Sequence, residues 1–286
     1  LGKRRGGHRL IEKPKVALKF LQQRILAHIL NQIPPHEAVH SFRPARNVVS
    51  YAQPHCDRPL LLRLDIADFF PALHVGRVRA LFRTAGYPDT VANLLADLCC
   101  HATPASILTE APDPLNWSQM KRLQSPHLPQ GAPTSPALSN LLAYRLDCRL
   151  AGLARATGAR YTRYADDLAF SGDRRVAKIA PQVGAILIEQ GFVPNHRKTR
   201  LQRRGTRQRL GGTIVNSPRP NIDRREFDRL KAILHNCAKR GPAGEDHEGL
   251  GLASFQLKLR GQIAWLNQLN PQRGSKLKTL FDQISW

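Results

Sequence analysis

Two adjacent aspartates interrupt a stretch of strand-forming residues in the middle of this chain. The stretch reads Tyr161-Thr162-Arg163-Tyr164-Ala165-Asp166-Asp167-Leu168-Ala169-Phe170-Ser171-Gly172. Aromatic and β-branched residues on both sides of a short polar segment are typical of a β-hairpin with a polar tip. Because neighbouring carboxylates repel each other, we expect a cation between them, and Mg²⁺ is a hard ion that prefers oxygen ligands. A solvated acidic turn is the alternative interpretation of residues 164–167.

A second acidic element lies about a hundred residues upstream, in Leu61-Leu62-Arg63-Leu64-Asp65-Ile66-Ala67-Asp68-Phe69-Phe70. This pattern predicts a strand that runs into Asp65. Such a strand can lie beside the hairpin and bring Asp65, Asp166 and Asp167 around one pair of metal ions. Two-metal sites hold their ions about 4 Å apart and stabilise the attacking and leaving oxygens of a phosphoryl displacement. Taken alone, Asp65 would be interpreted as a strand-end cap.

A third element is rich in glycine, proline and small residues. It reads Leu128-Pro129-Gln130-Gly131-Ala132-Pro133-Thr134-Ser135-Pro136-Ala137-Leu138-Ser139-Asn140. The glycine and prolines predict a tight loop, and Thr134 or Ser135 is expected to cap a helix that starts near Pro136. Small residues here allow a planar ligand to approach the backbone. By itself the segment could be any joint between a loop and a helix.

In this order and spacing the three elements resemble the catalytic motifs of the reverse transcriptase family. Residues 40–46 resemble the fingers motif of the bacterial enzymes, residues 191–199 the palm motif that follows the aspartates, and residues 207–216 the primer-grip hairpin. The resemblance covers roughly residues 10–286. The local sequence is most similar to that of retron enzymes in residues 130–136 and 161–167 and at the closing Trp265, Asn270-Pro271 and Trp286.

Two segments depart from the retron pattern. Many retron enzymes carry Asn-Ala-x-x-His between the first and second catalytic motifs, and residues 92–101 contain no such string. Many also carry Val-Thr-Gly after the primer grip, where this chain has Leu210-Gly211-Gly212. Both regions are linked in the family to recognition of a structured RNA. The departures therefore leave room for another bacterial defence reverse transcriptase or an intron-derived one.

The resemblance implies an α+β right-hand polymerase fold with fingers, a palm built on an antiparallel sheet with helices, and a helical thumb. These parts would occupy residues 1–59 (fingers), 60–216 (palm with part of the fingers) and 217–286 (thumb). Residues 1–7 contain no initiator Met, so we expect the fingers to lack upstream sequence.

Periodicity and turn residues predict the individual elements. Helices are expected near 15–32, 74–86, 90–100, 136–155, 176–190, 253–268 and 273–284, and from a cap at Asp223 to about 239. A strand is expected at 60–66, a hairpin at 160–172 and a strand pair within 199–215. Four prolines and the lack of a clear period predict irregular structure at 101–127.

The resemblance also implies roles for individual residues. Asp65, Asp166 and Asp167 would be the catalytic carboxylates and, with the backbone carbonyl of Ile66, the ligands of two Mg²⁺ ions. Asp68 would position backbone or water.

Phe70 matches the position that blocks a ribose 2′-OH in the family, with a core aromatic as the alternative. Gln130 matches a residue that contacts the incoming nucleotide, and Lys198 one proposed to protonate the leaving pyrophosphate. Arg43 is our candidate for the triphosphate, because a planar guanidinium binds phosphate bidentately. Lys13, Lys15 and Arg46 are alternatives to it.

Nucleic-acid contacts are expected from Tyr164 and from a basic run around the primer grip. Tyr164 would lie near the primer terminus, or would simply pack within the hairpin. Arg204, Arg207 and Arg209 belong to a run of seven positive charges in residues 197–209. Such a run is usually a solvated face. Its position beside the expected primer grip favours a track for phosphates instead.

Composition supports a polyanionic partner. The chain carries 44 Lys and Arg against 21 Asp and Glu, a formal net charge of +23. Counterion release then contributes much of the binding energy for nucleic acid. No apolar run of about 18 residues and no signal peptide occurs, so no membrane partner is expected. The five cysteines form no Cys-x-x-Cys pair, which disfavours zinc and favours a reducing cytoplasm.

Together these features predict an RNA-directed DNA polymerase of the retron type, which makes short cDNA from a structured noncoding RNA by two-metal nucleotidyl transfer and acts in antiphage defence. Its partners would be that RNA as template and primer, the RNA–DNA hybrid, dNTPs and a separate effector protein. Template-independent or protein-primed synthesis would use the same site. A catalytically decayed RNA-binding scaffold is the alternative from a different functional class.

Overall fold

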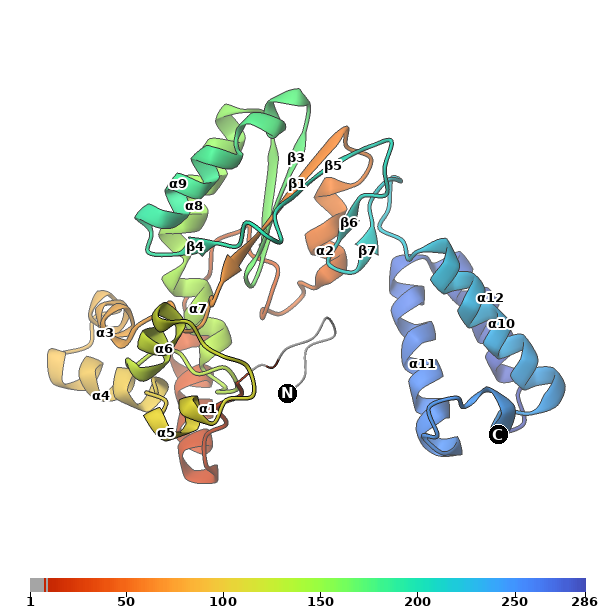
Figure 1. The fold of residues 1–286 in the computed structure, drawn as a ribbon, viewed down its shortest axis with the longest axis horizontal. Coiled ribbons are helices and arrows are strands. Elements are labelled where there is room, and N and C mark those ends of the chain that lie inside the picture. The colour runs from red at the N-terminus through yellow and green to blue at the C-terminus, as the bar shows by residue number, and fades with distance from the viewer. Residues whose placement is uncertain (1–7, 9) are drawn as a thin grey trace.

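The computed structural model describes residue 8 and residues 10–286 of the chain. The expectation that the fingers lack upstream sequence was drawn from residues 1–7, which lie outside the described residues. Helices and an antiparallel sheet are mixed along the chain (Figure 1), which confirms the α+β class. No helix in the described part of the chain is both long and apolar enough to cross a membrane.

The sheet is organised around β1. Strands β3, β4 and β5 all pair with β1, and β2 pairs with β3. The strands of the sheet are β1 (Leu60–Ala67), β2 (Arg160–Tyr164), β3 (Asp167–Gly172), β4 (Val193–Pro194) and β5 (Arg200–Arg203). β1 pairs with β3 along one edge and with β4 and β5 along the other, all antiparallel. β1 therefore lies inside the sheet, and its side chains alternate between two covered faces.

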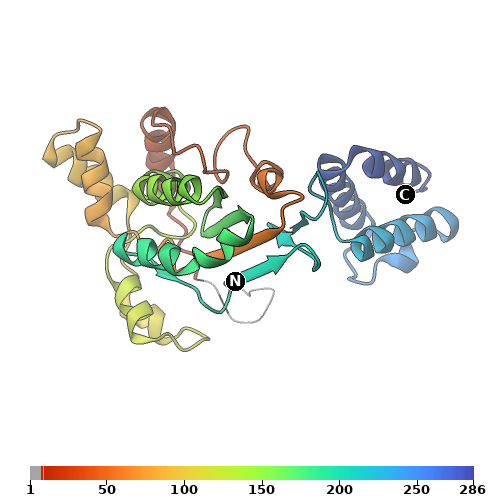
Figure 2. The same cartoon turned by 90° about the horizontal axis from the view of Figure 1, so that it is seen from above.

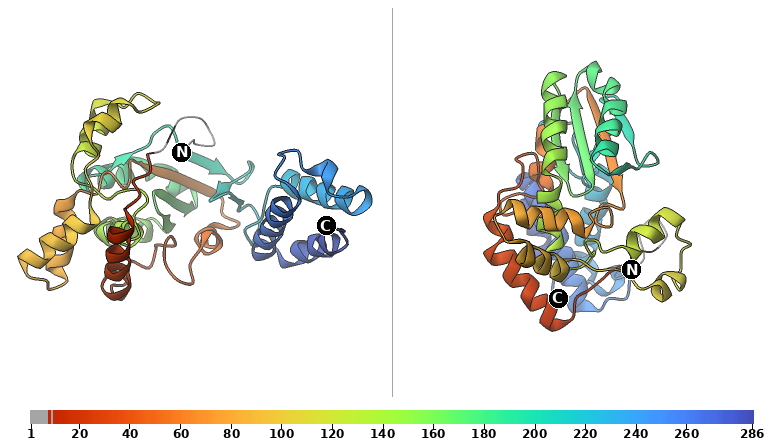
Figure 3. Two further views of the ribbon diagram at one scale, coloured as in Figure 1. Left: turned by 90° about the horizontal axis from the view of Figure 1, so that it is seen from below. Right: turned by 90° about the vertical axis from the view of Figure 1, so that its left-hand side faces the viewer.

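One face of the sheet packs on helices and forms the main core. Leu62, Leu64 and Ile66 of β1 point into this core. Figure 1 and the right-hand view of Figure 3 show α8 (Tyr144–Ala156) and α9 (Ala180–Glu189) lying together on this face. Leu150 of α8 and Leu187 of α9 are fully buried there.

Further helices extend this core beyond the end of the sheet. They are α1 (Val16–His28), α3 (Val75–Thr84), α4 (Asp89–Cys99) and α7 (Ser135–Leu142), with the short turns η1 (Leu30–Gln32) and η3 (Arg174–Lys178). The other face of β1 presents Leu61, which packs with Tyr51, Ala169 and Leu210. α2 (Val48–Ala52), η2 (Gln53–His55) and the hairpin of β6 (Arg209–Leu210) and β7 (Thr213–Ile214) cover this second face.

The structure corrects three expectations about local structure. Residues 136–155 form two helices, α7 and α8, because the chain turns at Ala143. The strand pair expected in 199–215 is shorter than predicted: only β6 and β7 pair with each other, and β5 joins β1 instead. Residues 101–127 contain α5 (Ala105–Thr109) and α6 (Trp117–Gln124). The four prolines of that segment lie outside both helices: Pro104 precedes α5, Pro112 and Pro114 lie between the helices, and Pro126 follows α6.

The predicted side-chain cap at the start of α7 is also wrong. Thr134 has helical backbone angles and its side chain forms no cap hydrogen bond. The hydroxyl of Ser135 is buried and finds no hydrogen-bond partner among the described residues. Pro136 supplies the stable start instead, since its fixed φ suits the first helical turn.

The C-terminal residues form a helical unit with its own core. It contains α10 (Arg224–Arg240), η4 (Ala243–Glu245), α11 (Leu252–Leu269) and α12 (Pro271–Asp282). As predicted, Asp223 begins α10, and its carboxylate accepts a hydrogen bond from the Arg225 backbone N–H. Leu234, Leu259, Leu266 and Leu277 are buried between the helices. Figures 1 and 2 show this unit at one end of the molecule, beyond the β6–β7 hairpin.

We predict that Gly274→Val destabilises this helical unit. A Cβ atom at Gly274 would lie 2.5 Å from Cα of Asn267, so α11 and α12 would have to separate. Overpacking of this kind costs about 1–3 kcal/mol. Denaturant unfolding followed by tryptophan fluorescence measures the effect, because Trp265 and Trp286 both belong to this core.

Gly261→Ala is the control for that variant. Gly261 is exposed on α11 with open space around its Cα, and alanine in a helix interior stabilises by about 0.5–1 kcal/mol relative to glycine. Equal stability of Gly274→Val and the wild type would contradict the close helix approach.

Candidate active site

The hairpin and the neighbouring strand bring the three predicted aspartates to one end of the sheet. In the antiparallel register Asp65 of β1 lies opposite Asp167 of β3. Asp166 occupies the turn between β2 and β3, and its carbonyl accepts a hydrogen bond of 2.9 Å from the Ile66 N–H. Ala165, also in the turn, has a φ of 54°, a left-handed conformation that alanine rarely adopts. Such a turn needs support from its surroundings.

A buried ion pair supplies much of that support. Arg163 of β2 and Asp147 of α8 are both completely buried, and the guanidinium donates two hydrogen bonds of 2.8 and 2.7 Å to the carboxylate. The remaining terminal nitrogen of Arg163 donates to the carbonyl of Ala165 at 3.2 Å and to the side chain of Asn140 at 3.3 Å. The guanidinium thus joins the turn to helices α7 and α8.

The loop before α2 holds the turn from the opposite side. The Ala165 N–H donates to the hydroxyl of Ser41 at 2.8 Å, and the Asn140 side chain donates to the Ser41 carbonyl at 2.9 Å. The backbones of Arg163 and His40 are also hydrogen-bonded at 2.9 Å. Residues of the fingers-like motif therefore fix the position of the aspartate turn.

Two cations neutralise two of the three carboxylates. Arg63 donates to both oxygens of Asp167 at 2.8 Å. Lys198 donates to both oxygens of Asp65 at 2.9 and 3.0 Å, and Asn195 donates to one of them at 3.1 Å. Among the described residues Asp166 forms no such ion pair, and it keeps an uncompensated charge at the centre of the group.

The pKa values of the two hairpin carboxyls reflect this imbalance. Burial, together with the charges of Asp65 and Asp167, raises the pKa of Asp166 to about 6. Burial also raises the pKa of Asp167, although Arg63 opposes that change. A buried cluster of like charges is costly, so the site has an electrostatic demand for cations.

The donor chemistry of the site fits Mg²⁺. Three carboxylates and a carbonyl oxygen are the hard ligands that this ion prefers. Among residues 8 and 10–286, no group of three or more acidic, histidine or cysteine side chains is arranged to hold a metal ion. Arg63 and Lys198 contact oxygens of Asp167 and Asp65, so these ion pairs compete with metal–carboxylate contacts for the same atoms.

The Gln130–Gly131 loop is held in place by the N-terminal segment. The Glu12 N–H donates to the Gln130 carbonyl at 2.9 Å. Gly131 has a φ of 134°, and a Cβ atom there would lie 3.1 Å from the Glu12 carbonyl, so the close crossing favours glycine. The Glu12 carboxylate accepts hydrogen bonds from Thr103 at 2.6 Å and His127 at 3.1 Å. Burial alone would raise the pKa of Glu12, but these hydrogen bonds lower it.

The remaining predicted nucleotide-binding residues are placed in different surroundings. Phe70 is half-buried beside Phe69, 5.6 Å between ring centroids. Lys198 reaches the site through Asp65. Arg43 points its guanidinium toward the carbonyls of His36 and Val39, each at 3.4 Å, and contacts none of the three aspartates in the described hydrogen bonds. Its assignment to the triphosphate stays a prediction, as do those of Lys13, Lys15 and Arg46.

The predicted nucleic-acid residues flank the second face of the sheet. Tyr164 is half-buried, with its ring centroid 5.6 Å from that of Tyr51. Arg204 pairs with Asp57 at 2.7 Å, whereas Arg207 and Arg209 both pair with Asp223 at 2.6 Å. These arginines are half-exposed, so they keep part of their charge available to a partner.

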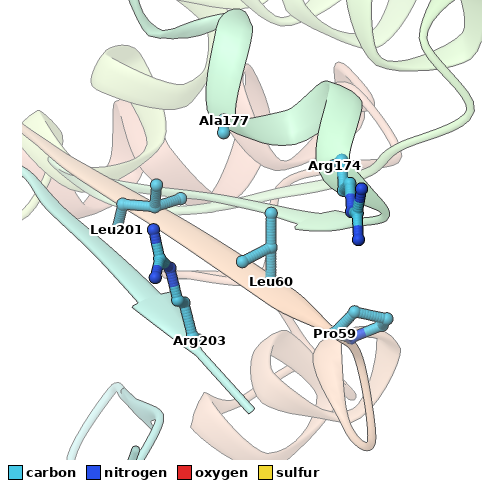
Figure 4. A pocket seen from close by; sticks show the side chains of 6 residues that line it. All are labelled: Pro59, Leu60, Arg174, Ala177, Leu201 and Arg203. Carbon is cyan, nitrogen blue, oxygen red and sulfur yellow. The ribbon is translucent and has the colours of Figure 1, made fainter. Parts of the chain in front are cut away.

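A hollow of about 430 Å³ opens at the other end of β1. Figure 4 shows Leu60 and Leu201 in its wall with the guanidinium groups of Arg174 and Arg203 at its sides. It shares no residue with the predicted site. The left-hand view of Figure 3 shows residues 10–15 leading into α1.

Sequence reasoning did not find three residues that organise the site. Arg63, Asp147 and Glu12 each pair with a site residue or its support, yet no local pattern in the sequence marks them. Arg63 had one available signal, because it lies two residues before Asp65 and so shares its face of a strand.

Comparison with known proteins identifies related sequences. Residues 1–221 match the family described as reverse transcriptase (RNA-dependent DNA polymerase). The retron Mx65 reverse transcriptase of Myxococcus xanthus is 41% identical over 281 residues, which are 96% of this chain and 61% of that protein. The retron Mx162 reverse transcriptase of the same species is 34% identical, over 95% of this chain and 57% of that protein. The retron Ec86 reverse transcriptase of Escherichia coli is 29% identical, over 93% and 78%. The chain thus spans only about three-fifths of the two Myxococcus relatives.

We predict that Arg163→Met lowers the free energy of unfolding by about 3–5 kcal/mol, because it leaves the buried Asp147 carboxylate without its partner. Urea unfolding measures the change. Arg175→Met is the matched control, since Arg175 forms a similar pair with Asp173 on the surface, and its stability should equal that of the wild type. Equal stability of the two variants would contradict the role of the buried pair.

We predict that Asp166→Asn stabilises the metal-free protein at neutral pH. Because the pKa of Asp166 is raised to about 6, the folded state binds its proton more tightly than the unfolded chain does. The contribution of this carboxyl to stability is therefore present below about pH 4 and is lost as the pH rises through about 6. Unfolding in EDTA should show that Asp166→Asn has a higher free energy of unfolding than the wild type, by on the order of 1–2 kcal/mol at about pH 7.5 after a discount for partial exposure. The difference should be smaller near about pH 4.5.

Asp97→Asn is the control for this pH dependence, because Asp97 is an exposed carboxyl on α4. Its stability should follow that of the wild type at both pH values. A pH-independent gain in Asp166→Asn would mean that the substitution acts through packing and not through the charge.

Proposed function

The chain belongs to the reverse transcriptase family, and from that membership we propose that it is an RNA-directed DNA polymerase of the retron type. The observation that carries the proposal is the register of β1 against β3. It sets Asp65 opposite Asp167, with Asp166 in the adjoining turn, at one end of the sheet. The two-metal chemistry of nucleotidyl transfer needs such a group of oxygen donors.

In this proposal Asp65, Asp166, Asp167 and the carbonyl of Ile66 hold two Mg²⁺ ions. When bound, these ions activate the primer hydroxyl and stabilise charge on the departing pyrophosphate. Lys198 exchanges its contact with Asp65 for one with the pyrophosphate, to which it gives a proton. Arg63 leaves Asp167 in the same exchange and keeps a positive charge beside the site.

The incoming dNTP lies between the palm and the N-terminal residues. Gln130 contacts its sugar or base edge through its amide, which can both donate and accept hydrogen bonds. Phe70 excludes a ribose 2′-OH by its bulk. Arg43 reaches the triphosphate after it gives up its long contacts to backbone carbonyls.

We propose the hand-like division of the chain at the boundaries set out above, with fingers in 1–59, palm in 60–216 and thumb in 217–286. Tyr164 would lie beside the primer terminus, and Arg204, Arg207 and Arg209 would follow the phosphates of the primer strand. The formal charge of +23 supports a nucleic-acid partner, because neutralised phosphates release their counterions. The thumb would hold an RNA–DNA hybrid by its shape.

The similarity to retron reverse transcriptases supports finer proposals. The template and primer would be a structured noncoding RNA, the product a short cDNA, and the setting antiphage defence with a separate effector protein. A catalytically decayed scaffold is disfavoured because Asp65, Asp166 and Asp167 are all present.

Copurification with the native locus tests this function. We predict that the protein, expressed with its upstream sequence, copurifies with a short DNA joined to RNA, which RNase and DNase treatment identifies. The double variant Asp166→Ala, Asp167→Ala should lack this DNA. On a primed RNA template it should lose dNTP incorporation at least about a thousandfold, because several kcal/mol of charge stabilisation disappear.

Asp89→Ala, Asp97→Ala is the matched double control, since both carboxyls are exposed and pair with surface arginines. It should retain the product and the activity. Bound RNA without DNA in every sample, and no incorporation by the wild type, would favour the scaffold. Incorporation without a native RNA–DNA product would retain the polymerase and reject the retron subtype.

A further inference from the structure

Phe42 is exposed and yet held in an unfavourable backbone conformation. Its side chain is 46% exposed, and its φ is 55°. A bulky residue in the left-handed region is a genuine outlier, and such outliers gather at functional sites. Glycine would adopt this angle without cost. The position nevertheless carries a phenyl ring, so the ring itself needs an explanation.

The residue before Phe42 is firmly anchored. Ser41 is completely buried, its hydroxyl accepts from the Ala165 N–H of the aspartate turn, and its carbonyl accepts from Asn140 of α7. Since the backbone is fixed at Ser41, the left-handed angle at Phe42 sets the direction of its ring.

The ring of Phe42 lies between the two aromatic residues predicted to border the nucleotide and the primer. The ring centroid of Phe42 is 6.4 Å from that of Phe70 and 6.4 Å from that of Tyr164. Phe70 continues to Phe69 at 5.6 Å, and Tyr164 continues to Tyr51 at 5.6 Å. Phe42 therefore links two aromatic pairs into one row beside the carboxylates, and it is the exposed member of that row.

We propose that Phe42 is a specificity-determining residue that fixes Phe70 against the sugar of the incoming nucleotide. This proposal rests on the proposed polymerase function. Phe70 can exclude a 2′-OH only if its ring cannot move away, and the exposed ring of Phe42 is its neighbour, with 6.4 Å between the ring centroids. The contact with Tyr164 sets the position of Phe42 itself, so the same ring couples the sugar pocket to the primer terminus.

The chemistry of the substrate follows from this geometry. The two phenyl rings of Phe42 and Phe70 offer no hydrogen-bond donor or acceptor, so a wall made of them favours a 2′-deoxyribose over a ribose, whose buried 2′-OH would find no partner against these rings. A hydrophobic pocket that merely closes around a substrate discriminates a hydroxyl by about a hundredfold, so loss of one wall should be measurable.

Single-nucleotide incorporation on a primed RNA template tests the proposal. The ratio of kcat/KM for dCTP to that for CTP is measured for the wild type, Phe42→Ala, Phe42→Tyr and Phe70→Ala. We expect Phe42→Ala to lower this ratio at least about tenfold, mainly through a lower KM for CTP, and Phe42→Tyr to preserve it. In the double variant Phe42→Ala, Phe70→Ala, loss of Phe42 should add nothing, because its effect passes through Phe70.

Phe20→Ala is the matched control, because Phe20 is an exposed phenylalanine of α1, 61% exposed and outside the aromatic row. Its selectivity should equal that of the wild type. Phe42→Gly gives a second test, since glycine relieves the backbone angle while it removes the ring. It should fold with unreduced thermal stability and still lose selectivity.

An unchanged selectivity ratio in Phe42→Ala would overturn the proposal, as would an equal effect of Phe42→Ala in the presence and absence of Phe70. A fall in activity toward dCTP and CTP alike, with a lowered melting temperature, would also overturn it and assign Phe42 a structural role. If the wild type incorporates no dCTP, the polymerase function fails and this inference fails with it. Incorporation by the wild type with unaltered selectivity in the variants removes the inference alone.

Discussion

The buried ion pair between Arg163 and Asp147 is the interaction on which the site depends. A fully buried pair gains little net stability, because desolvation opposes the attraction. Its value here is positional: the guanidinium bonds to α8, to Asn140 of α7 and to the carbonyl of Ala165 in the aspartate turn. The turn contains a left-handed alanine and an uncompensated carboxylate, and neither would keep its position without an external anchor. The hydrophobic core supplies the stability, and this pair supplies the geometry.

The cations around the carboxylates also help to hold the site together. Without a metal, three acidic groups at one end of a sheet would repel one another. Arg63 and Lys198 remove most of that repulsion from Asp167 and Asp65, so the strands can pair before any metal arrives. The raised pKa of Asp166 marks the charge that stays unpaired. The two ion pairs thus let the strands come together, and the remaining negative charge of Asp166 favours a cation at this place.

Much of this architecture could be predicted from sequence because it depends on local patterns. The strand-forming apolar runs of β1 and β3, the adjacent aspartates and the capping Asp223 are signals carried by neighbouring residues. The partners of the site were beyond such signals: Asp147 looks like any acid of an amphipathic helix, and Glu12 reaches His127 across 115 positions. The prolines of 101–127 were misleading because their effect depends on whether they precede a helix or interrupt one. The roles of Asp147 and Glu12 are decided by contacts with residues distant in sequence, which local propensity does not reveal.

The loop around Ser41 shows how one short segment can serve both stability and selectivity. Ser41 lies inward and completes the hydrogen bonds of the aspartate turn, so its loss would disturb the carboxylates themselves. Phe42, the next residue, points outward and touches Phe70 and Tyr164 without bonding to the turn. Because the left-handed angle at Phe42 separates these two directions, a change at position 42 can alter the aromatic row and leave the hydrogen bonds of the aspartate turn intact. If the proposed polymerase function holds, selectivity for the sugar can therefore vary independently of the chemistry of transfer, which requires that the carboxylates keep their register.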